Sequence, residues 1–243
     1  MRVAVPRRGR ALPLLQLAYD RDALPADKKS QNQLEQEALL AVVRALPSGV
    51  RPVVLADRGF GRAGFLSWLQ HPEIDYVVRL KKGGCITETD GERRWKLGEE
   101  GFKAGQLRWV RGVRYGLYHG RPRDLTINVS LCWRVPKSRA RDPPRKQPEE
   151  PWYLLATSLK DAQSAAASWY WQRGWIEQSL KDSKSRFGLE EVKVGCPKRL
   201  SRLLIALTVA LAWLTPLMGL AEVGVMCPGD GTRRWLREGG RAS

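Results

Sequence analysis

Residues 51–60, RPVVLADRGF, contain the short apolar run that decides the fold. The run ends on the carboxylate of Asp57, and Gly59 allows the backbone to turn sharply into the next segment. Short apolar runs bounded by turn signals are typical of parallel strands that are buried on both faces. We therefore expect a buried parallel strand that carries Asp57 at its carboxyl end.

The neighbouring segments alternate between strand and helix patterns. Residues 1–18 indicate two strands joined by a basic turn, and residues 29–46 repeat apolar side chains at helical spacing until Pro47 stops them. Residues 61–70 indicate another helix, whose phenylalanines would pack it onto the sheet, and residues 76–80 indicate another strand. Because strand and helix patterns alternate, the sequence predicts an α/β fold.

The second half of the sequence changes character twice. Residues 84–157 contain short strand patterns separated by turns, which predicts a β-rich insertion, and the proline-rich, charged residues 134–151 predict a mobile loop within it. From residue 158 onward the pattern is helical. The expected parts are a first part of the core at 1–83, the insertion at 84–157, a helical completion of the core at 158–222 and a flexible tail at 223–243.

The composition indicates a large core and a polyanionic partner. The chain has 243 residues, of which 43% are hydrophobic, and a formal net charge of +17. An excess of this size favours nucleic acid first and an anionic membrane surface second. The uncharged residues 203–221 reach the length of a membrane span, but Pro216 breaks the run. We interpret them as a core helix buried on all sides and expect no membrane partner.

A second informative stretch is WYWQRGWIEQSLKDSKSRFG at residues 169–188. Four of its polar side chains recur at helical spacing: Tyr170, Arg173, Glu177 and Lys184. On a continuous α-helix, at about 100° per residue, all four point into one sector roughly 60° wide. A carboxylate aligned with two cations and a phenol suits a metal ligand flanked by phosphate-binding groups. A solvent-exposed helix face with ordinary ion pairs has the same pattern.

Tryptophans surround this stretch. The chain contains ten, and Trp169, Trp171 and Trp175 stand beside the four polar residues. Aromatic rings among cations suit stacking on unpaired bases. Packing of the helix is the alternative, and we favour it for the three as a group.

Asp57 is a candidate ligand of a hard cation, because chemistry in open α/β sheets gathers at the carboxyl ends of strands. Capping of the following helix is the alternative role. Asp57 and Glu177 are far apart in the sequence and lie on either side of the expected insertion. Distant carboxylates of this kind are arranged around two metals in sites that catalyse in-line displacement at phosphorus.

These stretches resemble a known family. The four-residue signature, ADRGF at residues 56–60 and GRALPL at residues 9–14 are similar to the DDE-class insertion-sequence transposases. They are most similar to the IS-four-type group, which is named for the Tyr-Arg-Glu-Lys signature, and the resemblance covers roughly residues 7–215. It implies an α/β ribonuclease-H-like catalytic core with a β-rich insertion between the second Asp and the Glu.

The resemblance also implies roles for the candidate residues. Asp57 would be the second acidic ligand and Glu177 the third, in a two-metal Mg²⁺ site that Mn²⁺ can also fill. Tyr170, Arg173 and Lys184 would hold phosphates of the transposon end. The reaction would be hydrolysis at that end, followed by attack of the freed 3′-hydroxyl on target DNA. The partners would be DNA and a second copy of the chain, in the bacterial cytoplasm at the nucleoid.

The sequence departs from the family pattern at its start. The family's first catalytic Asp precedes the GRALPL hairpin, whereas residues 1–8 contain no acidic side chain. We therefore expect a transposase truncated at its N-terminus, without the first core strand, the first ligand and the region that binds DNA ends. The alternative function is a non-catalytic DNA-binding remnant of a transposase. A third interpretation is a general basic nucleic-acid binder that shares the spacing by chance.

Overall fold

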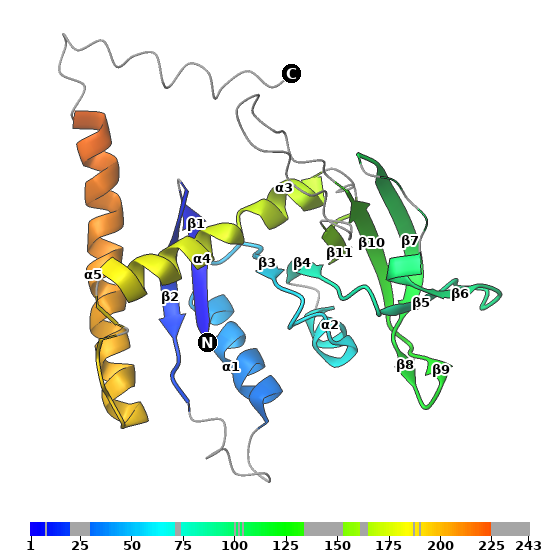
Figure 1. The fold of residues 1–243 in the computed structure, drawn as a ribbon, viewed down its shortest axis with the longest axis horizontal. Helices are drawn as coiled ribbons and strands as arrows, with labels where there is room; N and C mark the ends of the chain where they lie inside the picture. Colours follow the sequence, from blue (N-terminus) through cyan, green and yellow to red (C-terminus); the bar gives the residue numbers. More distant parts are fainter. Residues whose placement is uncertain are drawn as a thin grey trace.

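The structure is a computed structural model, and most of the chain is described by it. The described residues are 1–7, 9–19, 30–70, 74–99, 101, 103, 105–133, 153–160, 165–186, 188–189 and 191–224. The expected mobile loop at 134–151 lies outside these residues, as does the expected tail from 225 onward. Figure 1 shows a broad sheet on one side and a hairpin with a long helix on the other.

The principal layer is a seven-stranded mixed sheet. Its strands, in spatial order, are β3 (Val53–Ala56), β4 (Asp75–Arg79), β11 (Tyr153–Thr157), β10 (Thr126–Cys132), β7 (Leu107–Tyr115), β5 (Cys85–Thr87) and β6 (Arg94–Lys96). β3 and β4 are parallel, and the other neighbours are antiparallel. The predicted α/β class is therefore confirmed, and a large mixed sheet with few helices is compatible with a ribonuclease-H-like domain.

Two smaller hairpins accompany this sheet. One consists of β1 (Arg2–Arg7) and β2 (Arg10–Gln16), which confirms the two strands expected at the start of the chain. The other consists of β8 (Leu117–Tyr118) and β9 (Arg121–Pro122). The prediction that β3 is buried is only partly right: within the described chain it pairs with β4 alone, so it lies at the edge and most of its residues are half-buried.

Side chains of the central strands alternate between two apolar cores. In β4, Tyr76 and Val78 enter one core, whereas Val77 between them enters the other. This follows from the period of two along a strand. The helices α1 (Gln31–Arg44) and α2 (Ala63–Leu69) cover the first core, and α3 (Ala165–Trp171) covers the second. The sheet is therefore covered on both faces near β4.

The remaining helices attach to the hairpin of β1 and β2. They are α4 (Gly174–Lys181), the π turn Asp182–Arg186 that continues it, and α5 (Pro197–Gly224); a short 3-10 turn, Leu97–Glu99, follows β6. The guanidinium of Arg2 donates to the Ser179 and Ser183 hydroxyls at 3.2 and 3.1 Å, and the amide of Gln16 donates to Leu204 O at 3.3 Å. Polar side chains of the hairpin thus bind α4 and α5 to it, and both helices lie beside β2 (Figure 1).

The apolar segment at 203–221 forms the expected helix, but the expectation that this helix is buried on all sides is wrong. α5 continues through Pro216, because a proline inside a helix removes one hydrogen bond and kinks the helix without having to end it. The helix is not buried on all sides, since Ile205, Val209 and Trp213 are 59%, 53% and 71% exposed. A helix that lies against β2 on one side leaves its opposite side open. Within the described residues, no helix is long and apolar enough to cross a membrane.

Gly61 and Gly64 provide a matched test of packing behind β3. A Cβ added at Gly61 would lie 2.8 Å from the carbonyl oxygen of Arg79, whereas one added at Gly64 in α2 would meet nothing within 4 Å. We expect Gly61→Ala to lower the free energy of unfolding by about 1–3 kcal/mol, since backbone must shift. Gly64→Ala should raise it by up to about 1 kcal/mol through helix propensity. Urea denaturation of both variants measures the difference, and equal effects would contradict the close approach at Gly61.

Candidate active site

Asp57 follows β3 directly, at the carboxyl end of the strand. Its Oδ1 accepts a hydrogen bond of 2.9 Å from the backbone N–H of Gly59, which fixes the carboxylate over the turn. A Cβ at position 59 would lie 3.0 Å from the same oxygen, so a glycine leaves room for it. The residue that precedes α2 is Arg62, so the alternative that Asp57 caps this helix is wrong.

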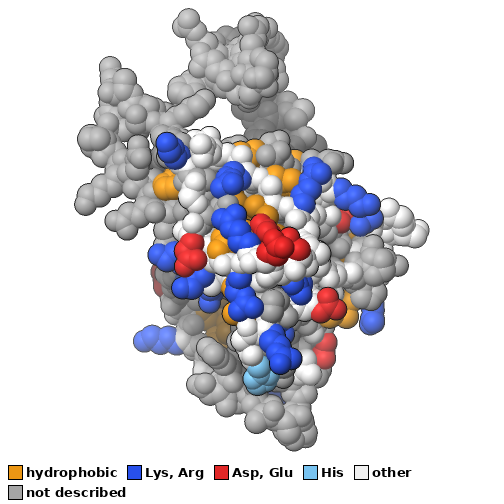
Figure 2. Space-filling view, turned by 90° about the vertical axis from the view of Figure 1, so that its right-hand side faces the viewer, with side chains coloured by type: hydrophobic (Ala, Val, Ile, Leu, Met, Phe, Trp, Pro, Cys, Tyr) orange, Lys and Arg blue, Asp and Glu red, His pale blue; other side chains and the backbone are white. Residues whose placement is uncertain are grey.

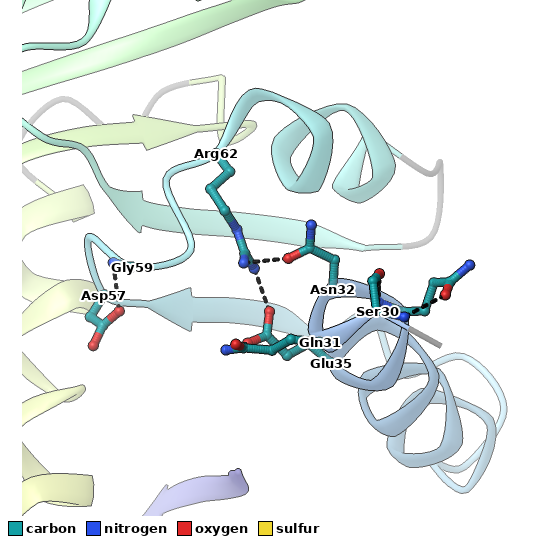
Figure 3. A network of polar contacts seen from close by, with 8 residues as sticks. Ser30, Gln31, Asn32, Glu35, Asp57, Gly59 and Arg62 are labelled. Carbon is teal, nitrogen blue, oxygen red and sulfur yellow. Dashed lines mark hydrogen bonds and ion pairs between the residues drawn. The ribbon is translucent and has the colours of Figure 1, made fainter. Parts of the chain in front are cut away.

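An ion pair between Arg62 and the buried Glu35 anchors the Asp57 turn to α1 (Figure 3). The guanidinium of Arg62 donates to the Glu35 carboxylate and to the side-chain oxygen of Asn32. Gln31 donates a further hydrogen bond of 2.9 Å to Glu35, whose side chain is only 6% exposed. Sequence reasoning missed this network. The signal for it was the position of Glu35 on the same helix face as the buried Ala38 and Leu39, where a lone charge requires a partner.

Aromatic rings support the same turn. The guanidinium of Arg62 lies 5.7 Å from the ring centre of Phe60 and 5.8 Å from that of Phe65. The two rings are 5.3 Å apart, and Phe65 is buried in the core beneath α2. This confirms the expectation that both phenylalanines pack α2 onto the sheet. It also means that Arg62 is held by ring faces as well as by carboxylate and amide groups.

The helix that carries the four-residue signature is not continuous. α3 ends at Trp171, and the chain then forms i→i−3 hydrogen bonds such as Arg173 N to Tyr170 O at 3.0 Å, before α4 begins. After α4, the π turn changes the rotation per residue again. The assumption of uniform α-helical rotation over the whole stretch is therefore wrong, and the single sector that was derived from it has no basis in this backbone.

Arg173 nevertheless joins the two candidate carboxylates. Its Nη2 lies 3.2 Å from Oδ2 of Asp57, and its Nη1 forms an ion pair with Oε1 of Glu177. The Arg173 side chain is 23% exposed, while those of Asp57 and Glu177 are 41% and 58% exposed. One guanidinium fork thus holds two carboxylates that are distant in the sequence at one place on the surface. Their catalytic roles stay predictions.

Tyr170 and Lys184 lie in different surroundings. Tyr170 is 4% exposed and belongs to the core under α3, and burial raises the pKa of its phenol above the usual value. The nearby Arg173 and Arg79 cations oppose part of that rise in pKa. Lys184 lies in the π turn with an exposed side chain. Tyr170 is therefore a buried neighbour of Arg173 and Asp57, while Lys184 lies at the surface.

The flanking tryptophans do not all pack the helix. Trp169 and Trp171 are 40% and 57% exposed, so the packing interpretation is wrong for these two. Trp175 is half-buried. Exposed indole rings beside cations keep a stacking role available, and that role stays a prediction.

The donor chemistry at Asp57 and Glu177 fits one hard cation. Carboxylate oxygens are the ligands that Mg²⁺ prefers, and this ion usually keeps several of its waters, so two carboxylates suffice to bind it. Within the described part of the chain, no cluster of three or more acidic, histidine or cysteine side chains could hold a metal. The described residues thus supply enough carboxylate donors for one ion. The expected two-metal site requires more carboxylate donors than these residues supply.

A family model described as "Transposase DDE domain" matches residues 15–213. Since this match spans most of the 243 residues, the chain belongs to the DDE transposase domain family. Transposases act on DNA by phosphoryl transfer, and DDE enzymes generally use divalent metal ions. A search of curated proteins finds no match.

Proposed function

We propose that this chain is a transposase of the IS-four-type group, which cuts and joins DNA strands at the ends of an insertion sequence. The observation that carries the proposal is the position of Arg173 between Asp57 and Glu177. In a protein of this family, two carboxylates and a guanidinium at the carboxyl end of a parallel strand are the groups needed to bind a cation and a phosphate together.

Asp57 and Glu177 would hold Mg²⁺, or Mn²⁺ in its place. When bound, the metal would activate the attacking hydroxyl and stabilise the leaving oxygen. Arg173 pairs with both carboxylates and so competes with a cation for the same oxygen atoms. Once a cation takes those oxygens, the guanidinium fork is available for bidentate contact with a phosphate. Metal binding and DNA binding would therefore favour each other at this site.

The remaining contacts of the proposal concern DNA. Tyr170 would support the phosphate beside Arg173, and Lys184 would add a point charge at the surface. Figure 2 shows that Lys and Arg outnumber Asp and Glu on the face at the right of Figure 1. With a net charge of +17, binding should weaken steeply as salt rises. We further propose that residues 84–157 form the family's β-rich insertion. We also propose that two copies of the chain form a dimer on the paired transposon ends.

A non-catalytic DNA-binding remnant is the second candidate function. It is favoured by one observation, which is that the described residues place only two carboxylates at the site. Such a protein would bind DNA, or a complete transposase on DNA, without cutting. Its binding would depend on the cations and not on Asp57 or Glu177.

Strand cleavage tests the choice between these functions. We expect the chain to nick a labelled duplex that carries the end of its own element in Mg²⁺ or Mn²⁺, and to leave it intact in excess chelator. The physical reason is that the carboxylates need a divalent cation to act on phosphorus. Cleavage that persists in chelator contradicts metal-dependent chemistry. Salt-sensitive binding without cleavage in either metal favours the non-catalytic remnant.

A further inference from the structure

A basic pocket opens beside the candidate site, at the carboxyl end of β4. Its volume is about 520 Å³, and Tyr115 and Leu154 form part of its wall. Four cationic side chains line it: Arg58, Arg79, Lys81 and Lys82. None of the described residues that line it is acidic. A concave surface with one sign of charge concentrates counter-ions, and here the counter-ion must be an anion.

The pocket is part of the folded sheet and not a flexible edge. Lys81 begins a tight turn, closed by a hydrogen bond of 2.9 Å from Gly84 N to its carbonyl oxygen. Leu97 N donates to Gly84 O at 2.8 Å, which ties the turn to the 3-10 turn after β6. A Cβ at Gly84 would lie 2.9 Å from the ring of Tyr115, so the wall is closely packed. The cations therefore project from a fixed frame.

This frame is also joined to the turn that carries Asp57. The hydroxyl of Tyr115 on β7 donates a hydrogen bond of 2.8 Å to the carbonyl oxygen of Gly61. Arg58 follows Asp57 in the chain, and Arg79 ends the strand parallel to β3. Because carboxyl ends of parallel strands meet at the same edge, the pocket and the Asp57 carboxylate share one edge of the sheet.

Arg58 and Lys81 in the pocket differ from Arg173 in their ion pairs. No carboxylate among the described residues forms an ion pair with Arg58 or Lys81, and both side chains are exposed. Arg173, by contrast, pairs with Asp57 and Glu177 at the neighbouring site. The Asp57 site thus combines two carboxylates with a shared guanidinium, whereas the charged side chains among the described residues that line the adjoining pocket are all cations. The Asp57 site suits a phosphate that binds together with a metal ion, and the pocket suits a phosphate that binds without a metal ion.

We infer that this pocket is a second phosphate-binding site, which holds the DNA strand at a phosphate next to the one placed at Asp57 and Glu177. The inference rests on the proposed function, since it takes DNA as the substrate. A strand is favoured over a free phosphate because the pocket adjoins the candidate site along one sheet edge, so successive phosphates of one strand can contact both. Arg58 and Lys81 are its DNA-binding residues.

Oligonucleotide binding without metal tests the inference directly. The probe is a fluorescein-labelled single strand of thymidines, and a duplex of equal length is measured beside it, both in excess chelator. The test variant is Arg58→Ala/Lys81→Ala, and the control is Arg44→Ala/Lys198→Ala, which removes the same charge from exposed positions outside the pocket. We expect Kd of the test variant to rise about tenfold or more for the single strand, and that of the control about threefold or less.

The salt dependence gives an independent readout. Each lost phosphate contact should reduce the slope of log Kd against log salt by about 0.7 for a single strand and 0.9 for a duplex. Equal changes in Kd and slope for the test and control variants would overturn the inference. Displacement of the labelled strand by inorganic phosphate or thymidine monophosphate as effectively as by an unlabelled strand would also overturn it, because the pocket would then bind a free anion.

Two further measurements keep the outcomes separate. Lys81→Glu reverses one exposed charge without touching the core, so a large loss of binding together with an unchanged thermal melt supports the inference. Cleavage is assayed on the same wild-type preparation. A protein that loses binding only in the pocket variants but never cuts DNA contradicts the proposed function alone. A protein that cuts DNA and binds equally well in both double variants contradicts the pocket alone.

Discussion

Glu177→Gln is expected to lower metal-dependent strand cleavage by on the order of 10³-fold or more, while the variant stays folded and binds DNA. The substitution keeps the shape of the side chain but removes the negative charge that a divalent cation needs. It also removes one of the two ion pairs of Arg173. That pair joins a side chain that is 58% exposed, so its loss should change the free energy of unfolding by less than about 1 kcal/mol.

Glu191→Gln is the matched control, because it makes the same chemical change at another exposed glutamate. It should leave cleavage within about twofold of the wild-type rate, as expected of a surface change away from the site. A second readout does not depend on turnover. Excess Mn²⁺ should raise the Tm of the wild-type chain, because a ligand that binds only the folded state stabilises it, and Glu177→Gln should lose this shift. An unchanged shift in the variant would show that Glu177 does not bind the metal.

The sequence was sufficient to place Asp57 and most elements of the first half. A short apolar run, a carboxylate and a glycine in succession have few structural solutions, and the structure has the parallel strand and the turn they predict. The burial of β3 was overestimated, since strand order depends on pairing between distant segments. A short apolar run has the same sequence pattern in a central strand and in an edge strand.

The helical half was predicted less well, for a local reason and a tertiary one. Gly174 has a low helix propensity, and α3 and α4 are separated beside it by i→i−3 hydrogen bonds, which the uniform 100° rotation could not anticipate. The juxtaposition of Arg173 with Asp57 is a contact between residues 116 positions apart. Only packing of α3 against the sheet creates it. Spacing within one segment cannot specify such a contact.

The same limit explains why the ion pair of Arg62 with Glu35 was missed. Each residue alone resembles an ordinary surface charge in the sequence, and only the apolar neighbours of Glu35 on α1 indicate otherwise. In the structure, Arg62 links α1 to the turn that begins at Asp57 (Figure 3). The position of the candidate ligand therefore depends on a residue outside the recognised motif.

Arg62→Ala is expected to lower the free energy of unfolding by about 2–4 kcal/mol, the largest stability loss of any single change considered for this chain. The carboxylate of Glu35, which is 6% exposed, would remain buried without its cation, and Phe60 and Phe65 would lose the guanidinium at their ring faces. The Arg62 side chain itself is 37% exposed, so water can solvate part of the vacated space, which keeps the value at the lower end of losses from buried pairs.

The double variant Arg62→Ala/Glu35→Gln separates the buried charge from lost packing. If the unpaired carboxylate causes the loss, replacing it by a neutral amide should restore at least about 1 kcal/mol in urea denaturation. Arg58→Ala, an exposed arginine in the same turn, should change the free energy of unfolding by less than about 0.5 kcal/mol. Arg62→Ala should also weaken the stabilisation by Mn²⁺, because the turn that orients Asp57 is no longer held to α1. A variant as stable as Arg58→Ala, with a normal response to Mn²⁺, would show that Arg62 neither stabilises the fold nor positions Asp57.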